Sequence, residues 1–527
     1  MEARDIILDR LKTPWDVIVI GGGITGAGIL KEASQRGLKC LLLEQRDFSW
    51  GTSSRSGKLV HGGLRYLKQG QIKTTWHSVR EREKLLREYS GLVEPLGFLV
   101  PAYGNSRVSK AMYHTGLTIY DLIAMRKSRC RYGGLQAGQL APTLKKYGLD
   151  CGFWFLDART DDARLVLRVI REGVRLGGTA INYARVEDLI KDRAGRVKGV
   201  FVRDTINGNT IEVQGKVVIN STGVWADRVH SFLGSPGKRP GLRPLRGSHL
   251  VFPYWRFPIS VALGLTHPED GRSLYVFPWE GNTLVGTTDL DHEFSLDTEP
   301  RISQREGKYL LSLVQEFFPS LALTSRDVIS TFSGIRPVVN TGQKDPSKES
   351  RDHVVWNENG LVTVTGGKLT TFNLLARETL AEAGKWLSST IGKDKGSFVK
   401  PPEKERIELP GDLEALHRQR LFGRYGFEAV LLAGEAERGD FKAIHGTGTL
   451  LAEIRWAARH EAVVHLDDLL LRRTRIGLLA PGGCIESLDR IRSVVQPVLG
   501  WDNQRWEDEV TRYVSLWQES YSPYLIN

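Results

Sequence analysis

The sequence predicts a mixed α/β (α+β) fold, in which a parallel sheet is interleaved with β-rich segments and followed by a helical region. Three observations carry this prediction. A buried strand, a glycine-rich turn, a helix and a second buried strand follow one another over residues 16–44. Further strand-like runs and turn signals alternate as far as residue 366, and residues from about 411 to 520 have helical patterns.

The first unit is built around the turn Gly21-Gly22-Gly23-Ile24-Thr25-Gly26, which follows the apolar run Val17–Ile20. In this pattern the first glycine permits a tight turn, the second lets backbone approach a pyrophosphate, and the third lets the helix pack close to the strand. The helix N-terminus favours phosphate, because its N–H groups are unpaired and carry partial positive charge. The pattern predicts a dinucleotide-binding βαβ unit.

The second strand of this unit ends at Glu44. A carboxylate roughly 20 residues beyond the glycines is typical of the residue that binds the ribose hydroxyls of a dinucleotide. It would repel a 2′-phosphate, so the sequence disfavours NADP. A chance glycine cluster in a loop is the alternative, but it explains neither the two strands nor the acid.

At 527 residues, with 41% hydrophobic and 25% charged residues, the chain should form roughly two to four globular domains. No apolar stretch approaches the roughly 18–20 residues of a spanning helix, and residues 1–14 lack the apolar core of a signal peptide. Cys40, Cys130, Cys151 and Cys484 form no Cys-x-x-Cys pair, so we expect the reduced thiols of a cytoplasmic protein.

The net charge of +12 and the isoelectric point near 9.4 suggest an anionic partner, unless they reflect only a solvated surface. Nucleic acid, an anionic membrane surface and an anionic substrate would each fit. The basic residues are spread along the chain without a recognised nucleic-acid motif. We therefore expect no nucleic-acid partner.

Further elements follow from periodicity and turn signals. Residues 80–88 and 161–177 have helical patterns, the second with Asp161 as its N-cap. Short strands run from residue 179 to 220, with hairpin signals at Ala194-Gly195 and Asn207-Gly208.

The later part of the chain returns to the first sheet. Runs at residues 216–220 and 361–366 each reach a glycine turn and are predicted to rejoin the parallel strands. A helix should follow over residues 370–387, then a linker over 392–402. The amphipathic pattern over residues 450–471 is typical of the helical region at the end of the chain.

A loop rich in serine and glycine, residues 51–66, follows the βαβ unit directly. Small hydroxyl residues and glycines can wrap a pyrophosphate and present backbone to a flavin. Lys58, His61 and Arg65 would then lie near the isoalloxazine ring. A plain surface loop is the alternative, and the position after a complete dinucleotide unit favours function.

Cations recur in later motifs. Lys368 follows two glycines and precedes a helix start, which suits a helix dipole aimed at a flavin or an anion. Arg336 is followed by Pro337, which suits rigid presentation of a guanidinium, and Arg351 is a further candidate. Each arginine alone is more typical of a solvated surface, but together these cations would form a pocket for a phosphate or carboxylate.

Histidines raise two further hypotheses. His249 leads into an apolar run and is either a satisfied core residue or a general base beside a reacting hydroxyl. His460-Glu461 and His465 lack the spacing of a His-Glu-x-x-His zinc motif, so we expect no metal site.

These motifs, in this order, resemble the FAD-dependent glycerol-3-phosphate dehydrogenases. Arg459-His460-Glu461 and the arginines of residues 472–475 resemble that family's helical cap domain, and the likeness extends from about Asp16 to Tyr513. The other matching strings are Gly21-Gly22-Gly23, Gly26-Ala27-Gly28, Thr52-Ser53-Ser54-Arg55-Ser56, Lys58-Leu59-Val60-His61-Gly62-Gly63-Leu64-Arg65-Tyr66, Asp161-Asp162-Ala163-Arg164-Leu165, Arg246-Gly247-Ser248-His249, Gly286-Thr287-Thr288-Asp289, Ser333-Gly334-Ile335-Arg336-Pro337 and Gly366-Gly367-Lys368-Leu369-Thr370-Thr371.

The resemblance implies an FAD-binding, Rossmann-like domain of the D-amino-acid-oxidase-like flavoprotein type, interleaved with a β-rich substrate domain and followed by a helical cap. We expect the FAD-binding domain within residues 1–400, in about 14–80, 160–240 and 355–390. The substrate-binding domain is expected in about 81–159 and 241–354, and the C-terminal α-helical cap in 401–527.

The resemblance also implies oxidation of sn-glycerol 3-phosphate to dihydroxyacetone phosphate, with hydride transfer from C2 to N5 of FAD and electrons passed to ubiquinone or menaquinone. His249 and His61, with Arg336, are the catalytic candidates, and which histidine takes the C2 hydroxyl proton stays open. The residues expected to bind the dianionic substrate are Arg65, Tyr66, Arg336, Arg351 and Lys368.

Contacts with the cofactor are expected along the glycine-rich and hydroxyl-rich segments. The residues are Gly21, Gly23, Ile24, Thr25, Gly26, Glu44, Thr52, Ser53, Ser54, Lys58, Leu59, His61, Gly62, Val186, Thr222, Gly223, Gly366, Gly367, Lys368, Leu369 and Thr370.

Quinone use requires contact with a bilayer, so we expect a cytoplasmic protein bound peripherally to the inner face of the cell membrane. Residues 107–131 are the candidate contact, and an ordinary core helix is the alternative. A homodimer is also compatible with the sequence. The apolar candidates are Met112, Tyr113, Leu117, Ile119, Tyr120, Leu122, Ile123 and Met125, and the flanking cations are Arg126, Lys127, Arg129 and Arg131.

Other functions are alternatives to this interpretation. An oxidase of the same substrate would deliver the electrons to oxygen, and an amino-acid or amine oxidase of the same fold would bind its carboxylate at Arg336. A basic protein that binds nucleic acid or membrane without catalysis would explain the charge. It would leave the complete dinucleotide unit unexplained.

Overall fold

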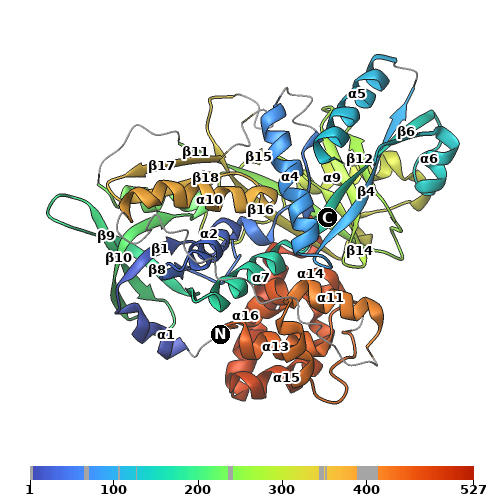
Figure 1. Cartoon of the computed structure of the whole chain (residues 1–527). Helices are drawn as coiled ribbons and strands as arrows, with labels where there is room; N and C mark the ends of the chain where they lie inside the picture. Colours follow the sequence, from blue (N-terminus) through green and yellow to red (C-terminus); the bar gives the residue numbers. More distant parts are fainter. Residues whose placement is uncertain are drawn as a thin grey trace.

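The computed structural model describes residues 4–64, 71–104, 107–125, 128–234, 241–343, 349, 353–387, 413–444 and 446–526. Within these residues the chain forms two β-sheets with helices packed on them and a group of C-terminal helices that covers one end of the molecule (Figure 1). The predicted mixed fold is confirmed. The bounds of the three predicted domains stay a prediction.

The first sheet contains the predicted dinucleotide unit. Its strands are β1 (Trp15–Ile20), β2 (Cys40–Leu43), β7 (Thr179–Ile181), β8 (Ala184–Lys191), β9 (Val197–Asp204), β10 (Thr210–Asn220), β17 (His353–Glu358) and β18 (Leu361–Gly366). The order is β17-β18-β10-β1-β2-β7, with β8 and β9 extending from β10. Strands β18, β10, β1, β2 and β7 are parallel, so the predicted returns to the sheet are confirmed, as are both hairpin turns beside β9.

Strand β1 is apolar throughout its core because both of its faces are covered. Val17 and Val19 face the helices α2 (Ile24–Gln35), α7 (Asp162–Arg175) and α10 (Phe372–Ala383). Ile18 and Ile20 face the β8–β9 hairpin and helix α1 (Arg4–Leu11). As predicted, Asp161 caps α7, and its carboxylate accepts a hydrogen bond from the backbone N–H of Arg164.

The second sheet is mainly antiparallel. Its strands are β3 (Leu59–Val60), β4 (Val93–Tyr103), β5 (Cys130–Gly133), β6 (Leu149–Thr160), β11 (Leu242–Pro253), β12 (Ala262–Thr266), β13 (Ser273–Trp279), β14 (Asn282–Gly286), β15 (Leu290–Asp291) and β16 (Ser330–Val339). The order is β15-β11-β14-β13-β12-β4-β6-β3, with β16 beside β11 and β5 beside β6. The helices that flank this sheet are α4 (Ile72–Glu88), α5 (Arg107–Ala124), α6 (Gly134–Leu140) and α9 (Gln304–Phe317). Helix α8 (Ala226–Ser231) contacts β10 and β18 of the first sheet.

The C-terminal region is helical, as predicted. Its elements are α11 (Ala415–Tyr425), α12 (Glu428–Glu435), α13 (Leu451–His460), the π-helix η8 (Asp468–Arg473), α14 (Ile476–Leu479), the 3₁₀ helix η9 (Pro481–Ser487), α15 (Leu488–Leu499), α16 (Asn503–Ser520) and the 3₁₀ helix η10 (Pro523–Ile526). Five further 3₁₀ turns join elements elsewhere: η1 (Thr52–Ser54), η2 (Gly223–Trp225), η3 (Pro319–Leu321), η4 (Ser325–Asp327) and η6 (Leu369–Thr371), and η7 (Gly384–Trp386) extends α10.

The amphipathic pattern at residues 450–471 does not form one helix. Helix α13 ends at His460, and Ala462 has a positive φ of 51°. The break allows the buried Glu461 carboxylate to accept two hydrogen bonds from Arg164, at 2.8 and 2.7 Å. A pairing with α7, distant in sequence, therefore accompanies the end of the helix at His460.

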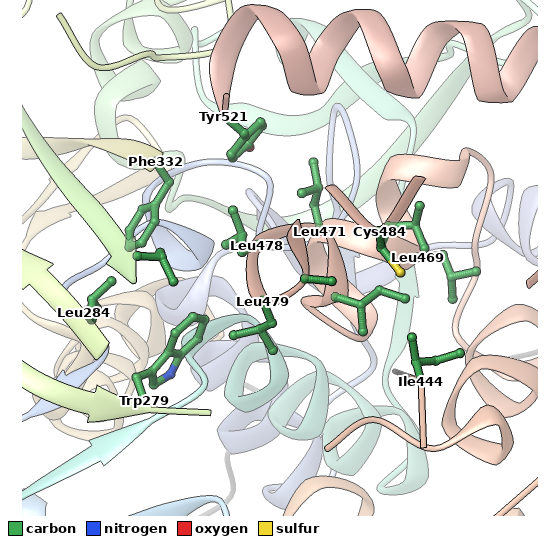
Figure 2. Close-up of a cluster of buried hydrophobic side chains, with 14 of the residues drawn as sticks. Trp279, Leu284, Phe332, Ile444, Leu469, Leu471, Leu478, Leu479, Cys484 and Tyr521 are labelled. Atoms are coloured by element: carbon green, nitrogen blue, oxygen red, sulfur yellow. The ribbon is translucent and has the colours of Figure 1, made fainter. Parts of the chain in front are cut away.

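Apolar packing joins the C-terminal helices to the second sheet (Figure 2). Leu471, Leu478 and Leu479 lie on the C-terminal side of the cluster. Trp279, a strand residue of β13, lies on the sheet side, and its indole N–H donates to the carbonyl oxygen of Thr160. All four side chains belong to one buried cluster, so the C-terminal region shares a core with the second sheet.

Buried charges make a second junction, between η8 and the loop that follows β2. Asp47, which is fully buried, accepts hydrogen bonds from Nη1 and Nη2 of Arg473 at 2.6 and 2.7 Å, and it also pairs with Arg472. Burial would raise the pKa of Asp47, but Arg473 and Arg472 hold that pKa below its usual value. An unpaired charge here would be costly, so these groups require one another.

No described helix is both long and apolar enough to span a bilayer. All four cysteines are free, and Cys40, Cys151 and Cys484 are buried. The described residues contain no group of three or more potential ligands arranged to hold a metal ion.

The first prediction concerns the buried junction. We expect Arg473→Met to lower the free energy of unfolding by about 3–5 kcal/mol, because Asp47 then loses its bidentate partner in a buried site. Thermal and denaturant unfolding of the purified protein would measure the change. The control is Glu507→Gln in the same region, whose exposed pair with Arg492 should be worth less than about 1 kcal/mol. Equal effects of the two variants would contradict the assignment.

Candidate active site

A cavity of about 430 Å³ lies at the carboxyl ends of β1, β2, β10 and β18. It begins beside Ile20 and Glu44 on one side and reaches Ser221 and Thr365 on the other. Ligands of parallel α/β sheets bind at this edge, where the glycine turns leave room for them. The predicted dinucleotide-binding turn, with Gly21 and Gly23, therefore lines this cavity.

Most residues predicted to contact the cofactor line this cavity, and a smaller set lies behind the lining. The lining residues are Gly21, Gly23, Ile24, Thr25, Glu44, Thr52, Ser53, Val186, Thr222, Gly223, Gly366, Gly367, Lys368 and Leu369. Those outside the lining are Gly26, Ser54, Lys58, Leu59, His61, Gly62 and Thr370.

The glycines have the geometry that the motif requires. Gly21 has a φ of +108°, and a Cβ there would lie 2.7 Å from the carbonyl oxygen of Ser221. Gly26 is buried against β1, and a Cβ there would lie 1.9 Å from the carbonyl oxygen of Gly21. Gly26 therefore acts by letting α2 pack on the strand.

Glu44 joins the glycine turn to the end of β2. Its carboxylate accepts hydrogen bonds from the backbone N–H groups of Gly22 at 2.7 Å and Arg46 at 2.9 Å. Burial raises the pKa of Glu44, although these two N–H groups favour the charged form. Contact with a ribose stays a prediction, and Glu44 lines the cavity where that contact would form.

Lys58 lies behind the cavity wall. Its side chain is fully buried, and the ammonium donates to Asp162 at 2.8 Å and to the carbonyl oxygen of Ser54 at 2.6 Å. Burial, with Arg475 nearby, lowers the pKa of Lys58 to about 7. Arg475 also donates to the carbonyl oxygen of Ser54 at 2.6 Å, so both cations brace the loop that carries Thr52 and Ser53.

His249 lies on β11, directly opposite Phe332 of β16 and Gly286 of β14. Its ring stacks on Phe332 with centroids 4.5 Å apart, and a Cβ on Gly286 would lie 2.2 Å from its Cδ2. The side chain is buried, and no described residue bonds its Nδ1. Burial, together with Lys58 and Arg336, lowers the pKa of His249 well below 6.5, so the ring is neutral near pH 7.

Of the predicted substrate cations, Lys368 lines the large cavity and Arg336 does not. Arg336, on β16, is partly exposed and bonds the segment that follows β14. Lys368 lines the cavity and donates to Ser78 Oγ of α4 at 3.2 Å. Arg65, Tyr66 and Arg351 lie outside the described residues.

His61 lies beside a smaller hollow of about 60 Å³, next to Tyr275 and Asp157. Its carbonyl oxygen accepts a hydrogen bond from Thr370 Oγ1 at 3.4 Å, which joins this segment to the start of η6. Gly62 donates its N–H to Asp157 at 2.9 Å. The His61–Gly62 segment therefore joins the smaller hollow to the start of η6.

Comparison with known proteins decides the family. A family described as "FAD dependent oxidoreductase" matches residues 16–377, and one described as "C-terminal domain of alpha-glycerophosphate oxidase" matches residues 375–506. An aerobic glycerol-3-phosphate dehydrogenase of Staphylococcus haemolyticus is 35% identical over 499 residues, covering 89% of this chain and 88% of that protein. The chain belongs to the FAD-dependent glycerol-3-phosphate dehydrogenase family. The resemblance drawn from the motifs is confirmed.

Two further relatives agree with this assignment. The Bacillus subtilis aerobic glycerol-3-phosphate dehydrogenase is 32% identical over 538 residues, covering 97% of this chain and 95% of that protein. The solved glycerol-3-phosphate dehydrogenase of Bacillus halodurans, complexed with FAD, has a TM-score of 0.76 and 26% identity, and the match covers 98% of this chain and 97% of that one. The chain is thus a flavoprotein oxidoreductase of this family, and the predicted fold type is confirmed.

The residues of the cavity fit FAD. The N-terminus of α2, with Ile24 and Thr25 in the lining, would hold the pyrophosphate. At the other end, Gly366 and Gly367 have φ values of +79° and +78°, and they bring backbone rather than side chains to the wall. Lys368 adds a positive charge there.

Sequence reasoning missed two aromatic residues of this cavity. Trp50 and Trp225 both line it, with ring centroids 5.7 Å apart, and a Cβ on Gly51 would lie 3.1 Å from the Trp225 ring. Trp225 comes directly after the glycine turn that ends β10, which is the signal that could have identified it. Trp50 carries no such signal, because its place depends on the loop that follows Asp47.

The second prediction concerns Gly26. We expect Gly26→Ala to weaken FAD binding at least about tenfold, because a Cβ at 1.9 Å from the carbonyl oxygen of Gly21 must push α2 away from β1. Flavin content and the dissociation constant of FAD would measure this. Gly434→Ala in α12 is the control, since nothing lies within 4 Å of its added Cβ. Unchanged FAD affinity in Gly26→Ala would refute this role of the turn.

Proposed function

We propose that this chain oxidises sn-glycerol 3-phosphate to dihydroxyacetone phosphate and passes the electrons to a membrane quinone. The observation that carries the proposal is the buried ring of His249, whose pKa is lowered by burial and by the nearby charges of Lys58 and Arg336. A base and a cation are the two groups that oxidation of a phosphorylated secondary alcohol requires. Family membership supports the same substrate.

FAD, held by the residues that line the large cavity, would supply the two-electron redox chemistry when bound. Arg336 and Lys368 attract and orient the dianionic phosphate and the substrate oxygens. His249 takes the proton of the C2 hydroxyl, because its depressed pKa keeps the ring unprotonated near neutral pH. The apolar Phe332 ring against it excludes water from one face of the imidazole.

Between the two candidate histidines we favour His249 as the base. The pKa of its ring is lowered by burial and by the charges of Lys58 and Arg336, so the ring can accept a proton near neutral pH. His61 borders the smaller hollow, and its carbonyl oxygen accepts the bond from Thr370. We assign His61 to the wall of the site.

Anaerobic absorbance spectroscopy tests the function. The purified holoenzyme is mixed with sn-glycerol 3-phosphate, glycerol or a panel of amino acids, and the oxidised flavin band is recorded. Bleaching by glycerol 3-phosphate alone supports the proposal, and bleaching by an amino acid instead would overturn it. Reoxidation by a short-chain quinone or by oxygen then separates the dehydrogenase from the oxidase.

The third prediction concerns the base. We expect His249→Gln to slow the limiting rate of flavin reduction by about 10²–10⁴-fold, the usual contribution of a general base. The matched control is His267→Gln, a buried histidine that bonds the carbonyl oxygen of Tyr309 instead. The wild-type rate should stay constant as the pH falls to 6.5 and decline only below it, since protonation of His249 removes the base. A slow His61→Gln variant beside a normal His249→Gln would reverse the assignment.

We also propose that α4 and α5 form the contact with an anionic membrane. Leu117 and Tyr120 of α5 are buried, whereas Leu122 and Met125 are 78% and 77% exposed. Trp76 of α4 is 44% exposed, and the two helices pack on each other (Figure 1). Of the predicted apolar face, Leu117 and Tyr120 therefore belong to the core and Ile119, Leu122 and Met125 face solvent. The side chains of Met112 and Tyr113, and the flanking Arg126 and Lys127, lie outside the described residues.

Positive charge accompanies these exposed side chains. The guanidinium of Arg80 lies 5.6 Å from the centre of the Trp76 ring, and its Nη1 is 3.4 Å from Met125 Sδ. Apolar side chains beside cations are typical of surfaces that enter the headgroup region of anionic bilayers. Such a surface would bring the enzyme to the membrane from which quinone is drawn.

The fourth prediction tests this surface. We expect the double variant Leu122→Glu/Met125→Glu to lose binding to vesicles of phosphatidylglycerol and phosphatidylcholine while anaerobic flavin reduction by substrate continues. Co-sedimentation measures the binding. Leu135→Glu is the control, because Leu135 is 80% exposed but lies on α6. Equal vesicle binding by the double variant and the wild type would exclude this surface.

A further inference from the structure

Arg336 is held in one orientation by the segment that follows β14. Its Nη1 donates to Asp289 Oδ1 at 2.6 Å, and its Nη2 donates to Thr287 Oγ1 at 3.0 Å. Both nitrogens also lie 3.4 Å from the carbonyl oxygen of Thr288. The Asp289 side chain is 1% exposed and that of Arg336 is 24% exposed, so the guanidinium reaches from a buried anchor toward a more open space.

The space for this guanidinium exists because residue 247 is a glycine. Gly247 of β11 lies opposite Gly334 of β16. A Cβ on Gly247 would lie 2.3 Å from Arg336 Nη2 and 2.6 Å from Thr287 Oγ1. A side chain at this position would therefore displace Arg336 from both partners.

The segment that binds Arg336, residues 287–289, is itself held in place by helix α9. Glu306, in the first turn of α9, is buried and accepts hydrogen bonds from Thr288 Oγ1 at 2.7 Å and Ser248 Oγ at 2.8 Å. Thr288 Oγ1 in turn accepts the N–H of Ser248 at 2.9 Å. The segment that carries Thr287 and Asp289 is thereby tied to β11 and α9.

Asp289 is shared by two arginines. Its carboxylate lies 2.6 Å from Arg336 and 3.4 Å from Arg272, so one negative charge faces two guanidiniums. A free arginine side chain carries about 2 kcal/mol of rotamer entropy. A pairing that removes this freedom before an anion arrives makes binding tighter, because the ordering cost is already met.

We propose that Asp289 is a positioning residue that presents Arg336 to the phosphate of the substrate, and that Gly247 provides the space for it. The inference rests on the proposed function for the identity of the anion. Asp289 acts only through Arg336. It therefore governs the affinity for the anion rather than the rate of hydride transfer.

The test compares Asp289→Asn with Asp289→Glu in the FAD-loaded enzyme. Anaerobic stopped-flow reduction by sn-glycerol 3-phosphate gives the apparent dissociation constant and the limiting rate separately. For Asp289→Asn we expect the dissociation constant to rise about tenfold and the limiting rate to change by less than about threefold, with partial rescue by Asp289→Glu. The control is Asp291→Asn, two residues away, whose partner is Arg243.

Calorimetric titration with inorganic phosphate measures anion binding directly, without turnover. Weaker phosphate binding in Asp289→Asn, with binding retained in Asp289→Glu and Asp291→Asn, supports the inference. An unchanged dissociation constant, or equal losses in Asp289→Asn and Asp291→Asn, would overturn it. If glycerol 3-phosphate fails to reduce the wild type, the proposed function fails, and the phosphate titration still decides the role of Asp289.

Discussion

The need to pair buried charges organises this molecule. Residues 49–56, most of which line the large cavity, are held in place by charge pairs that include Asp47 and Asp162. Both carboxylates are fully buried. Their partners include Arg472, Arg473 and Arg475, which all come from the C-terminal region. No residue beyond Leu369 is in the described lining of the large cavity, yet the loop that walls it is held by arginines about 100 positions later in the chain. The helical region is therefore part of the cofactor site without touching the cavity.

The same pairing changes how the charge of +12 is understood. Arg164, Arg424, Arg472, Arg473 and Arg475 are among the largest fully buried side chains. Each is paired with a carboxylate, so none of them contributes to an attractive surface. The net charge is thus weak evidence for any particular partner. The local placement of Arg80 beside Trp76, or of Arg336 in the active site, carries more information.

Local patterns predicted the features that depend on neighbouring residues. The βαβ unit around Gly21, the Asp161 cap and the hairpin at Asn207-Gly208 follow from turn and helix chemistry within a few positions. Features set by distant pairing could not be read in this way. The break at His460 depends on Arg164, and the orientation of Arg336 depends on Asp289.

His249 shows why the chemistry of a site is harder to predict than its fold. The sequence allowed either a satisfied core residue or a base. In the structure the His249 side chain is buried like that of a core residue, but no described residue bonds its Nδ1, so it is not a satisfied core histidine. This combination arises because Phe332 and Gly286, on two neighbouring strands, enclose the ring without offering it a hydrogen bond. Only the register of β11, β14 and β16 brings these residues together.

Hydride transfer from C2 of the substrate is tested most directly by a kinetic isotope effect on flavin reduction, the first half of the reaction. The rate of anaerobic flavin reduction would be measured with sn-glycerol 3-phosphate carrying either hydrogen or deuterium at C2. We expect flavin reduction to be several-fold slower with deuterium than with hydrogen, because the C2 hydride is transferred to FAD in the step observed. Reduction at equal rates with both isotopologues, under conditions where binding is saturated, would contradict it.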